Sequence, residues 1–420
     1  MYIVCVITSI IFGLFALMKE KKITNPLTIL CLIYGITSLL AGLRLYNTIE
    51  TDNLVFIIVT IGIISCFCGY LLATRIYFKN RGFDSINDKI VKLMIIFVAI
   101  FSTYQFSQVF SLLLSGADLD TIRMIYYGTT VDGIATNYFV KQLEVYLNLP
   151  FIYIIMIIFA NYIVGKKIVN LNKMYITIII YSIIVTQLCS GGRMIILFFI
   201  MDVIVAFLIN KKSDIVFLLK KNKKVVFAII FSIFIILYLT EIRTFDASNS
   251  KGLLYTIYIY LSCPYMIFSG HLESFTQNTT FGFSLISGFI RPFIILTQYI
   301  TGFSPKSLNL VYDIATTVSI NAIQIAPNQL SNAFTTMFSY FFLDGKWIGL
   351  IFDSVIMMFF ITSIYKKEKK YHTNYYLLMY CLVLQALIFS FIRYQYIVVS
   401  MTLPFFYIQF LFKKNKGNKS

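Results

Sequence analysis

The chain has 420 residues, of which 59% are hydrophobic and only 13% are charged. So few charges could not cover a water-soluble protein of this size, and the apolar residues come in blocks of roughly 18 to 22, each long enough to cross a bilayer as a helix. The net charge of +17 would suit a nucleic-acid partner, but in a membrane protein it reflects the preference of Lys and Arg for cytoplasmic loops. We therefore expect an all-α, polytopic integral membrane protein that binds membrane lipid and no nucleic acid.

The apolar blocks predict about 11 transmembrane helices. In chain order they cover residues 2–18, 26–43, 54–73, 93–114, 143–164, 174–190, 194–209, 225–240, 347–364, 374–391 and 396–412. Two further stretches, 253–268 and 283–300, could cross as a pair, dip in and return, or lie on the surface, so the expected count is 11 to 13. The first block lacks a basic leader and a small-residue cleavage site, which favours a retained helix over a signal peptide.

The distribution of Lys and Arg predicts the orientation of these helices. Alternate connections hold 25 of the 35 basic residues: 19–25, 75–92, 165–173, 210–224, 365–373 and the tail after 412. This set is expected to be cytoplasmic, which places the N-terminus outside and the C-terminus inside. We expect one integral membrane domain over residues 1–420, in which residues 241–346 form a long, ordered extracytoplasmic segment.

Arginine departs from this pattern. Six of the eight arginines fall on the predicted outer side: Arg44, Arg123, Arg193, Arg243, Arg291 and Arg393. The positive-inside effect does not separate Arg from Lys, so another cause is needed. The planar guanidinium binds phosphate or carboxylate through two parallel hydrogen bonds. Either these arginines bind an anionic substrate, or they pair with outer acidic residues such as Asp118, Asp120 and Glu241.

Other candidate side chains are few. His271 is a candidate general base, since neutral imidazole can take a proton from a sugar hydroxyl near pH 7. Tyr255 and Tyr258 would either stack on sugar rings or anchor the chain at the membrane surface. Asp202 and Asp353 lie within spans and should face the protein interior.

Two short acidic motifs are either functional or parts of solvated loops. The "DLD" of residues 118–120 resembles a metal-binding DxD, and the "ETD" of residues 50–52 resembles an acidic pair of lipid-linked transferases. No HExxH, GxSxG or GxxxxGK[ST] sequence is present, and no His, Cys and carboxylate residues have metal-ligand spacing. We expect no metal and no cofactor.

The stretch "SGGR", residues 190–193, ends one apolar block just before another. It resembles the "SGSRG" signature of oligosaccharide repeat-unit polymerases of the Wzy type, and residues 332–350 resemble the segment in which a DxG-like turn opens that family's last spans. Gly192 stands where the family often has Ser, and Met194 where it often has Gly. The resemblance in motifs is confined to these two segments, while the architecture is similar over the whole chain.

The resemblance implies a metal-independent inverting glycosyltransferase of the C type, acting outside the cytoplasmic membrane. Such an enzyme joins undecaprenyl-pyrophosphate-linked oligosaccharides into capsular or O-antigen polysaccharide, with a flippase and chain-length regulators as partner proteins. The alternatives are a flippase or transporter of the same lipid-linked sugars, a ligase that moves finished glycan to another acceptor, and a scaffold protein.

The predicted site combines both lines of reasoning. Arg193 and Arg291 are expected to bind the departing pyrophosphate, and His271 to act with them in catalysis. The expected substrate-binding residues are Gly191, Gly192, Arg123, Arg243, Arg393, Tyr255 and Tyr258. The two glycines allow close backbone approach, and Arg193 is expected at the N-terminus of the next helix, whose dipole favours an anion. The alternative is that Arg193 only extends its charge to the membrane surface from a helix end.

Overall fold

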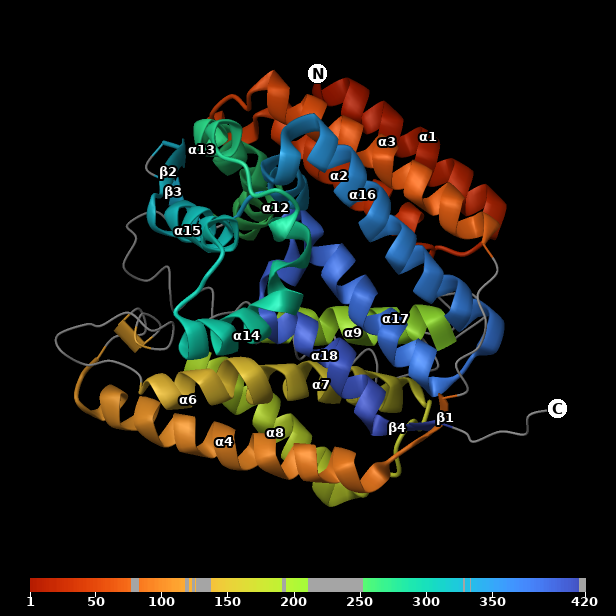
Figure 1. Cartoon of the computed structure of the whole chain (residues 1–420), viewed down its shortest axis with the longest axis vertical. Coiled ribbons are helices and arrows are strands. Elements are labelled where there is room, and N and C mark those ends of the chain that lie inside the picture. The colour runs from red at the N-terminus through yellow and green to blue at the C-terminus, as the bar shows by residue number, and fades with distance from the viewer. Residues whose placement is uncertain are drawn as a thin grey trace. The chain divides into compact units, whose positions relative to one another are not determined.

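The computed structural model describes residues 1–76, 83–117, 121–122, 125, 137–190, 194–210, 252–327, 329–332 and 334–414 (Figure 1). In this described part, nine helices are long and apolar enough to cross a membrane, and two shorter apolar helices accompany them. The chain is a multi-pass, almost entirely helical membrane protein. The predicted span 225–240 and the residues Asp118 and Asp120 lie outside the described residues.

The chain forms two compact units that alternate along the sequence. The first unit contains residues 1–79, 251–371 and 386–399, and the second contains residues 80–250, 372–385 and 400–420. Neither unit is one continuous stretch of chain, so each is assembled from segments far apart in sequence.

The first unit contains three N-terminal helices, most of the predicted long segment 241–346, and a 35-residue helix that follows this segment. Its helices are α1 (Tyr2–Glu20), α2 (Pro26–Leu43), α3 (Asn53–Arg75), α12 (Leu253–Gly270), α13 (Leu272–Gln277), α14 (Phe283–Thr301), α15 (Lys306–Ile320) and α16 (Met337–Tyr371). Three one-turn 3₁₀ helices join them: η1 (Leu45–Asn47), η3 (Phe389–Phe391) and η4 (Gln395–Ile397). The strands β2 (Ile323–Ala326) and β3 (Gln329–Ser331) form an antiparallel hairpin.

Helices α3 and α16 lie side by side in the centre of this unit (Figure 1). Gly69 allows their close approach, because a Cβ atom placed there would lie 2.3 Å from the backbone oxygen of Val355. Around this contact Tyr34, Phe338 and Phe341 are fully buried, and the Tyr34 hydroxyl donates to the backbone oxygen of Ser390 at 2.9 Å. Burial of large aromatic side chains with satisfied hydroxyl groups stabilises the packing of these helices.

The second unit is built from helices joined by short loops. It contains α4 (Asp88–Leu114), α6 (Tyr138–Leu143), the π-helix η2 (Glu144–Asn148), α7 (Leu149–Val164), α8 (Lys173–Ser190), α9 (Met194–Asn210), most of α17 (Asn374–Ile388) and α18 (Val399–Leu411). The strands β1 (Phe83–Ile86) and β4 (Phe412–Lys414) pair antiparallel. α4 packs against α8, and α7 packs against α9.

The predicted span with the largest difference from the structure is 347–364, and the two stretches left open, 253–268 and 283–300, are helices. The predicted span 347–364 is the second half of α16, which begins ten residues earlier and is interrupted only at Gly345 and Lys346, where the backbone leaves the helical region. The long segment is helical as well: 253–268 corresponds to α12 and 283–300 to α14. Of these two, only α14 is among the helices long and apolar enough to cross a membrane.

Candidate functional site

One predicted outer arginine, Arg291, lies on a helix that contacts η4, and another, Arg393, lies two residues before η4 in the sequence. α14 contacts η4 and α15. The Arg291 guanidinium, on α14, lies 3.5 Å from the ring centroid of Tyr312 on α15. The Tyr312 hydroxyl donates in turn to the backbone oxygen of Ile397 in η4, at 3.2 Å. Arg393 precedes η4 in the break between α17 and α18. We call Arg291, Tyr312 and Arg393 the arginine cluster.

The cations of the arginine cluster differ from Arg44 in their partners. Arg44, one of the predicted outer arginines, forms a salt bridge with Glu50. Among the residues that the structure describes, neither Arg291 nor Arg393 forms a salt bridge, and both are only partly exposed. When a guanidinium stacks on an aromatic face, its N–H groups point outward in the guanidinium plane, where they can bind an anion.

An apolar surface continues from Arg291 along α14. Phe293, Leu296 and Ile300 are 62%, 60% and 72% exposed. A cation beside exposed apolar side chains suits a ligand with an anionic head and a hydrocarbon tail. A proline disfavours helix at the residue before it, but α14 is continuous through Arg291 and Pro292. The preference is a statistical one, and the rest of a 19-residue helix outweighs it here.

The start of α14 is fixed by the break in α16. The Asp344 carboxylate accepts hydrogen bonds from the backbone nitrogens of Ser284 at 2.8 Å and Leu285 at 2.9 Å, and from the Thr280 hydroxyl. These nitrogens lie in the first turn of α14, where a carboxylate satisfies unpaired donors and opposes the helix dipole. The DxG-like turn therefore positions the helix that carries Arg291.

The same break also fixes the end of α13. The Lys346 ammonium group donates to the backbone oxygen of Phe275 at 2.8 Å and to that of Asn278. Backbone carbonyls at a helix C-terminus lack partners within the helix and favour a cation. Asp344 and Lys346 thus hold the two helix ends on either side of the α13–α14 connection.

His271 lies at the junction of α12 and α13. It is 8% exposed, and its Nε2 lies 3.1 Å from the backbone oxygen of Asn321 at the end of α15. A carbonyl only accepts, so Nε2 carries the proton and Nδ1 of the neutral ring remains a base. Burial lowers the pKa of His271 below its usual range, and the hydrogen bond to Asn321 opposes this only in part.

The structure does not bring His271 and Arg291 together. Their partners on α15, Asn321 and Tyr312, are nine residues apart. At a rise of 1.5 Å per residue, this is about 13 Å along the helix. A general base must stand within hydrogen-bond reach of the proton that it removes, so one substrate hydroxyl beside Arg291 is beyond the reach of His271.

The two predicted sugar-binding tyrosines have structural partners. Tyr258 is 5% exposed, and its hydroxyl donates to the backbone oxygen of Leu40 at 3.0 Å. Tyr46 packs edge-on against both Tyr255 and Tyr258, with ring centroids 5.1 and 5.3 Å apart. Tyr258 therefore joins α12 to α2. Tyr255, which is partly exposed, is the better placed of the two to contact a ligand.

Several predicted site residues lie outside the described residues: Arg123, Gly191, Gly192, Arg193 and Arg243. The flanking helices are described on both sides of these residues, α8 up to Ser190 and α9 from Met194. The backbone nitrogen of Ile196, in the first turn of α9, donates to the Gln187 side-chain oxygen at 3.1 Å. At least one of the donors at this helix start is therefore already satisfied by the protein.

Glu144, which the sequence analysis overlooked, is buried near the end of α8. It is 1% exposed and lies 3.5 Å from the Lys141 ammonium group. It begins the π-helix η2, and such distortions often accompany functional sites. The buried amide of Asn148, at the other end of η2, has no hydrogen-bond partner among the described residues. One signal was available: Glu144 is an acidic residue inside the predicted span 143–164, three residues after Lys141.

Four other acidic residues that the sequence singled out lie on described helices or loops: Asp202, Asp353, Glu50 and Asp52. Asp202 and Asp353 face the interior as expected, at 0% and 5% exposure. In the "ETD" motif, Glu50 pairs with Arg44, and Asp52 caps α3 by accepting from the backbone nitrogen of Leu54 at 2.8 Å. Among the described residues, no three His, Cys, Asp or Glu side chains are grouped so that they could hold a metal ion.

Comparison of the chain with protein-family models, with curated proteins and with solved structures found no match. The geometry of the described residues therefore carries the functional argument.

Proposed function

We propose that the protein polymerises lipid-linked oligosaccharide repeat units at the outer face of the cytoplasmic membrane. The observation that supports this is the arginine cluster. Arg291 is stacked on Tyr312, has no ion-pair partner among the described residues, and lies beside exposed apolar residues of α14. An undecaprenyl-pyrophosphate-linked sugar offers the matching features, a strongly anionic group and a long hydrocarbon chain.

In the proposed reaction, a hydroxyl oxygen of the incoming repeat unit attacks the anomeric carbon of the growing chain. The bond from that carbon to the pyrophosphate oxygen breaks, and its electron pair leaves with the undecaprenyl pyrophosphate. The hydroxyl proton passes to a base. Arg291 and Arg393 bind the pyrophosphate and stabilise the charge that develops as it departs, which is the step where fixed cations have the largest effect on rate.

Arg291→Lys and Arg291→Ala test the proposal. Lys keeps the charge but loses the planar fork and the stacking on Tyr312, so both variants should make polymer roughly 10²- to 10³-fold more slowly. The measurement is glycan chain length on a gel, normalised to the protein in the membrane. Arg44→Lys is the matched control, because Arg44 is an outer arginine that already has a carboxylate partner.

The Arg291→Ala variant and deletion of the gene together distinguish the polymerase from the alternative functions. Normal chain length in Arg291→Ala at normal abundance would contradict the proposal. Deletion of the gene should leave single repeat units outside the cell, because repeat units would still be exported. If no repeat units appear outside, the protein is a flippase, and if long glycan accumulates on its lipid carrier, the protein is a ligase.

A further inference from the structure

α9 carries a single charged residue, Asp202, at the middle of its 17 residues. The rest of the helix is apolar except for Asn210 at its end. The Asp202 side chain is buried, at 0% exposure. A carboxylate in such surroundings is costly unless a cation pairs with it or a proton neutralises it. The groups around Asp202 therefore determine its charge.

One described side chain forms a hydrogen bond with Asp202. The Gln385 Nε2 atom, on α17, donates to Oδ2 of Asp202 at 3.4 Å, where α9 and α17 lie close together (Figure 1). Gln385 is also 0% exposed. The second oxygen of each side chain, Oδ1 of Asp202 and Oε1 of Gln385, has no hydrogen-bond partner among the described residues. Two buried acceptors thus lack a donor, and each of them costs free energy.

The described residues also offer Asp202 no cation. Asp202 takes part in none of their salt bridges. α9 packs against α7 and α8, and α7, α8, α9 and α17 together contain one other charged residue, Lys173, which is exposed at the start of α8. Their remaining titratable side chains are tyrosines and cysteines, such as Tyr153 and Cys381, which are uncharged at neutral pH. An ionised Asp202 would therefore be an unpaired buried charge.

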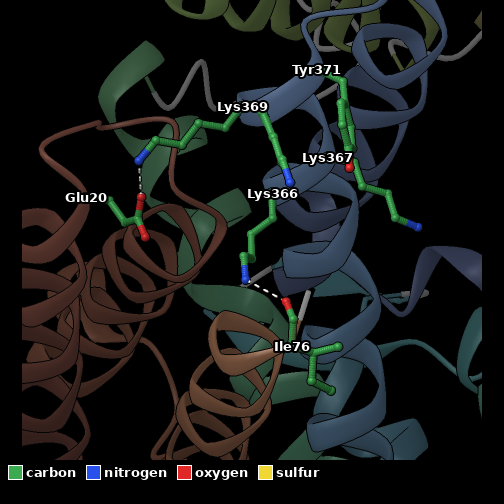
Figure 2. Close-up of a pocket in the computed structure, with 7 residues that line it drawn as sticks. Glu20, Ile76, Lys366, Lys367, Lys369 and Tyr371 are labelled. Atoms are coloured by element: carbon green, nitrogen blue, oxygen red, sulfur yellow. Dashed lines mark hydrogen bonds and ion pairs between the residues drawn. The ribbon is translucent and has the colours of Figure 1, made fainter. Parts of the chain in front are cut away.

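Figure 2 shows how the first unit satisfies charges at the ends of α1, α3 and α16. Lys369 pairs with Glu20. Lys366 donates to three backbone oxygens, of which that of Ile76 is drawn. Each of these charges thus has an opposite charge or several dipoles as partners, whereas Asp202 has one amide N–H group. Neutralisation of the carboxylate by a proton is the remaining way to stabilise its burial.

We propose that Asp202 and Gln385 form a proton-binding site, in which Asp202 is a neutral carboxylic acid. A proton taken from water and bound to Oδ1 of Asp202 makes this oxygen a donor to Oε1 of Gln385, while Oδ2 still accepts from Nε2. One proton thus supplies the missing donor for both oxygens and removes the buried charge. A metal ion fits less well, because hard cations take about six or more oxygen ligands and this pair offers two. The site shares no residue with the arginine cluster and does not depend on the polymerase proposal.

Infrared spectroscopy of the purified full chain in detergent tests this proposal, because a neutral carboxylic acid has a carbonyl stretching band that a carboxylate lacks. At neutral pH the wild type should show this band, and Asp202→Asn should lose the component that Asp202 contributes. Asp313→Asn, at an exposed carboxylate, is the control and should leave the band unchanged. In Gln385→Leu the acid should remain, but its band should move to higher wavenumber because Oδ2 loses its donor. Identical bands in the wild type and Asp202→Asn would show that Asp202 is ionised and would overturn the proposal.

The same spectra distinguish a proton from a bound metal cation. The band that Asp202 contributes should be equal in sodium chloride and in N-methyl-D-glucamine chloride, whose large organic cation cannot enter a buried site. If the band appears only after Na⁺ has been removed, the pair binds Na⁺ and the proton assignment is wrong.

Thermal stability provides a second, independent test. Asn at position 202 can pair with Gln385 through the same two hydrogen bonds without a proton, so the Tm of Asp202→Asn should equal or exceed that of the wild type at pH 6. Above about pH 4 the unfolded chain releases the Asp202 proton, whereas the folded chain holds it. The Tm of the wild type should therefore fall relative to that of Asp202→Asn by roughly 1 to 2 °C for each pH unit between 6 and 9. A lower Tm in Asp202→Asn at pH 6, or a constant difference over this range, would contradict the proton-binding site.

Discussion

At the scale of single residues, the sharpest expectation concerns Arg193. It directly precedes the first residue of α9. If it binds the pyrophosphate, Arg193→Lys and Arg193→Ala should both reach the membrane in normal amounts yet polymerise roughly 10²- to 10³-fold more slowly. Glycan length per amount of membrane protein is the measurement. The control is Arg75→Lys, at the end of α3, which should change nothing. Long polymer in Arg193→Ala would leave Arg193 as an anchor at the membrane surface.

The burial of His271 predicts how the stability of the folded protein depends on pH. Its pKa is lowered in the folded protein, so near and below pH 6.5 the unfolded chain binds more protons than the folded one. The free energy of unfolding is therefore highest above the pKa of His271 in the unfolded chain. It falls as the pH decreases from about 6.5 toward the lower pKa of His271 in the folded protein. The Tm of the wild type should drop more between pH 7.5 and 5.5 than that of His271→Gln, whose amide can still donate to Asn321. Parallel curves would show that His271 contributes nothing to this dependence.

The same variant separates two roles of His271. Gln cannot act as a base, but it can replace the structural hydrogen bond to Asn321. Normal polymer length in His271→Gln would assign His271 to the packing of α12 and α13 against α15. Loss of polymer at unchanged Tm would restore it as the base that the sequence predicted.

At the scale of elements, the break in α16 should matter through α14. In Asp344→Ala, the backbone nitrogens of Ser284 and Leu285 lose their acceptor. The loss of a helix cap and of buried hydrogen bonds should cost about 2 kcal/mol or more, which lowers Tm by roughly 2 °C or more for a chain of this length. Asp313→Ala, at an exposed carboxylate on α15, is the control and should leave Tm unchanged. Equal Tm values in the two variants would contradict the capping role of Asp344.

The sequence predicts elements best where one apolar block makes one helix. The expected 26–43 is α2, and the expected 174–190 and 194–209 are α8 and α9 within a residue. It fails at α16, where Asp344 and Lys346 interrupt the apolar pattern and so set the predicted start at residue 347. Their charges are neutralised by the ends of α14 and α13, and that pairing depends on tertiary packing that no local pattern contains.

The candidate site could be predicted only in part, because the contacts between its side chains depend on tertiary packing. The unequal distribution of arginine drew attention to Arg291 and Arg393, because residue type is read directly from the sequence and the membrane side is predicted from the positions of Lys and Arg. The stacking on Tyr312 could not be foreseen, since it depends on how α14 and α15 pack. Glu144 was missed because its burial arises from neighbours on other helices. The sequence also gave no sign that the Tyr258 hydroxyl donates a hydrogen bond to the backbone oxygen of Leu40 in α2.

At the scale of the whole molecule, the orientation of the chain is open to direct measurement. Lys306, at the start of α15, belongs to the segment expected outside, whereas Lys167 belongs to a connection expected inside. A cysteine at position 306 should react with an impermeant thiol reagent in intact cells. A cysteine at position 167 should react only after the cells are opened. The reverse pattern would invert the topology and place the arginine cluster on the cytoplasmic side.

The alternation of the two units along the sequence has a consequence for synthesis. α3 is complete at Arg75, but its main packing partner, α16, begins only at Met337. At about 5–20 residues per second, α3 waits roughly 15–50 s for α16 to leave the ribosome. During that time its small residues, including Gly69, face lipid or an insertion factor instead of Val355. The nascent chain must therefore be kept from pairing with the wrong helix until its last quarter has been translated.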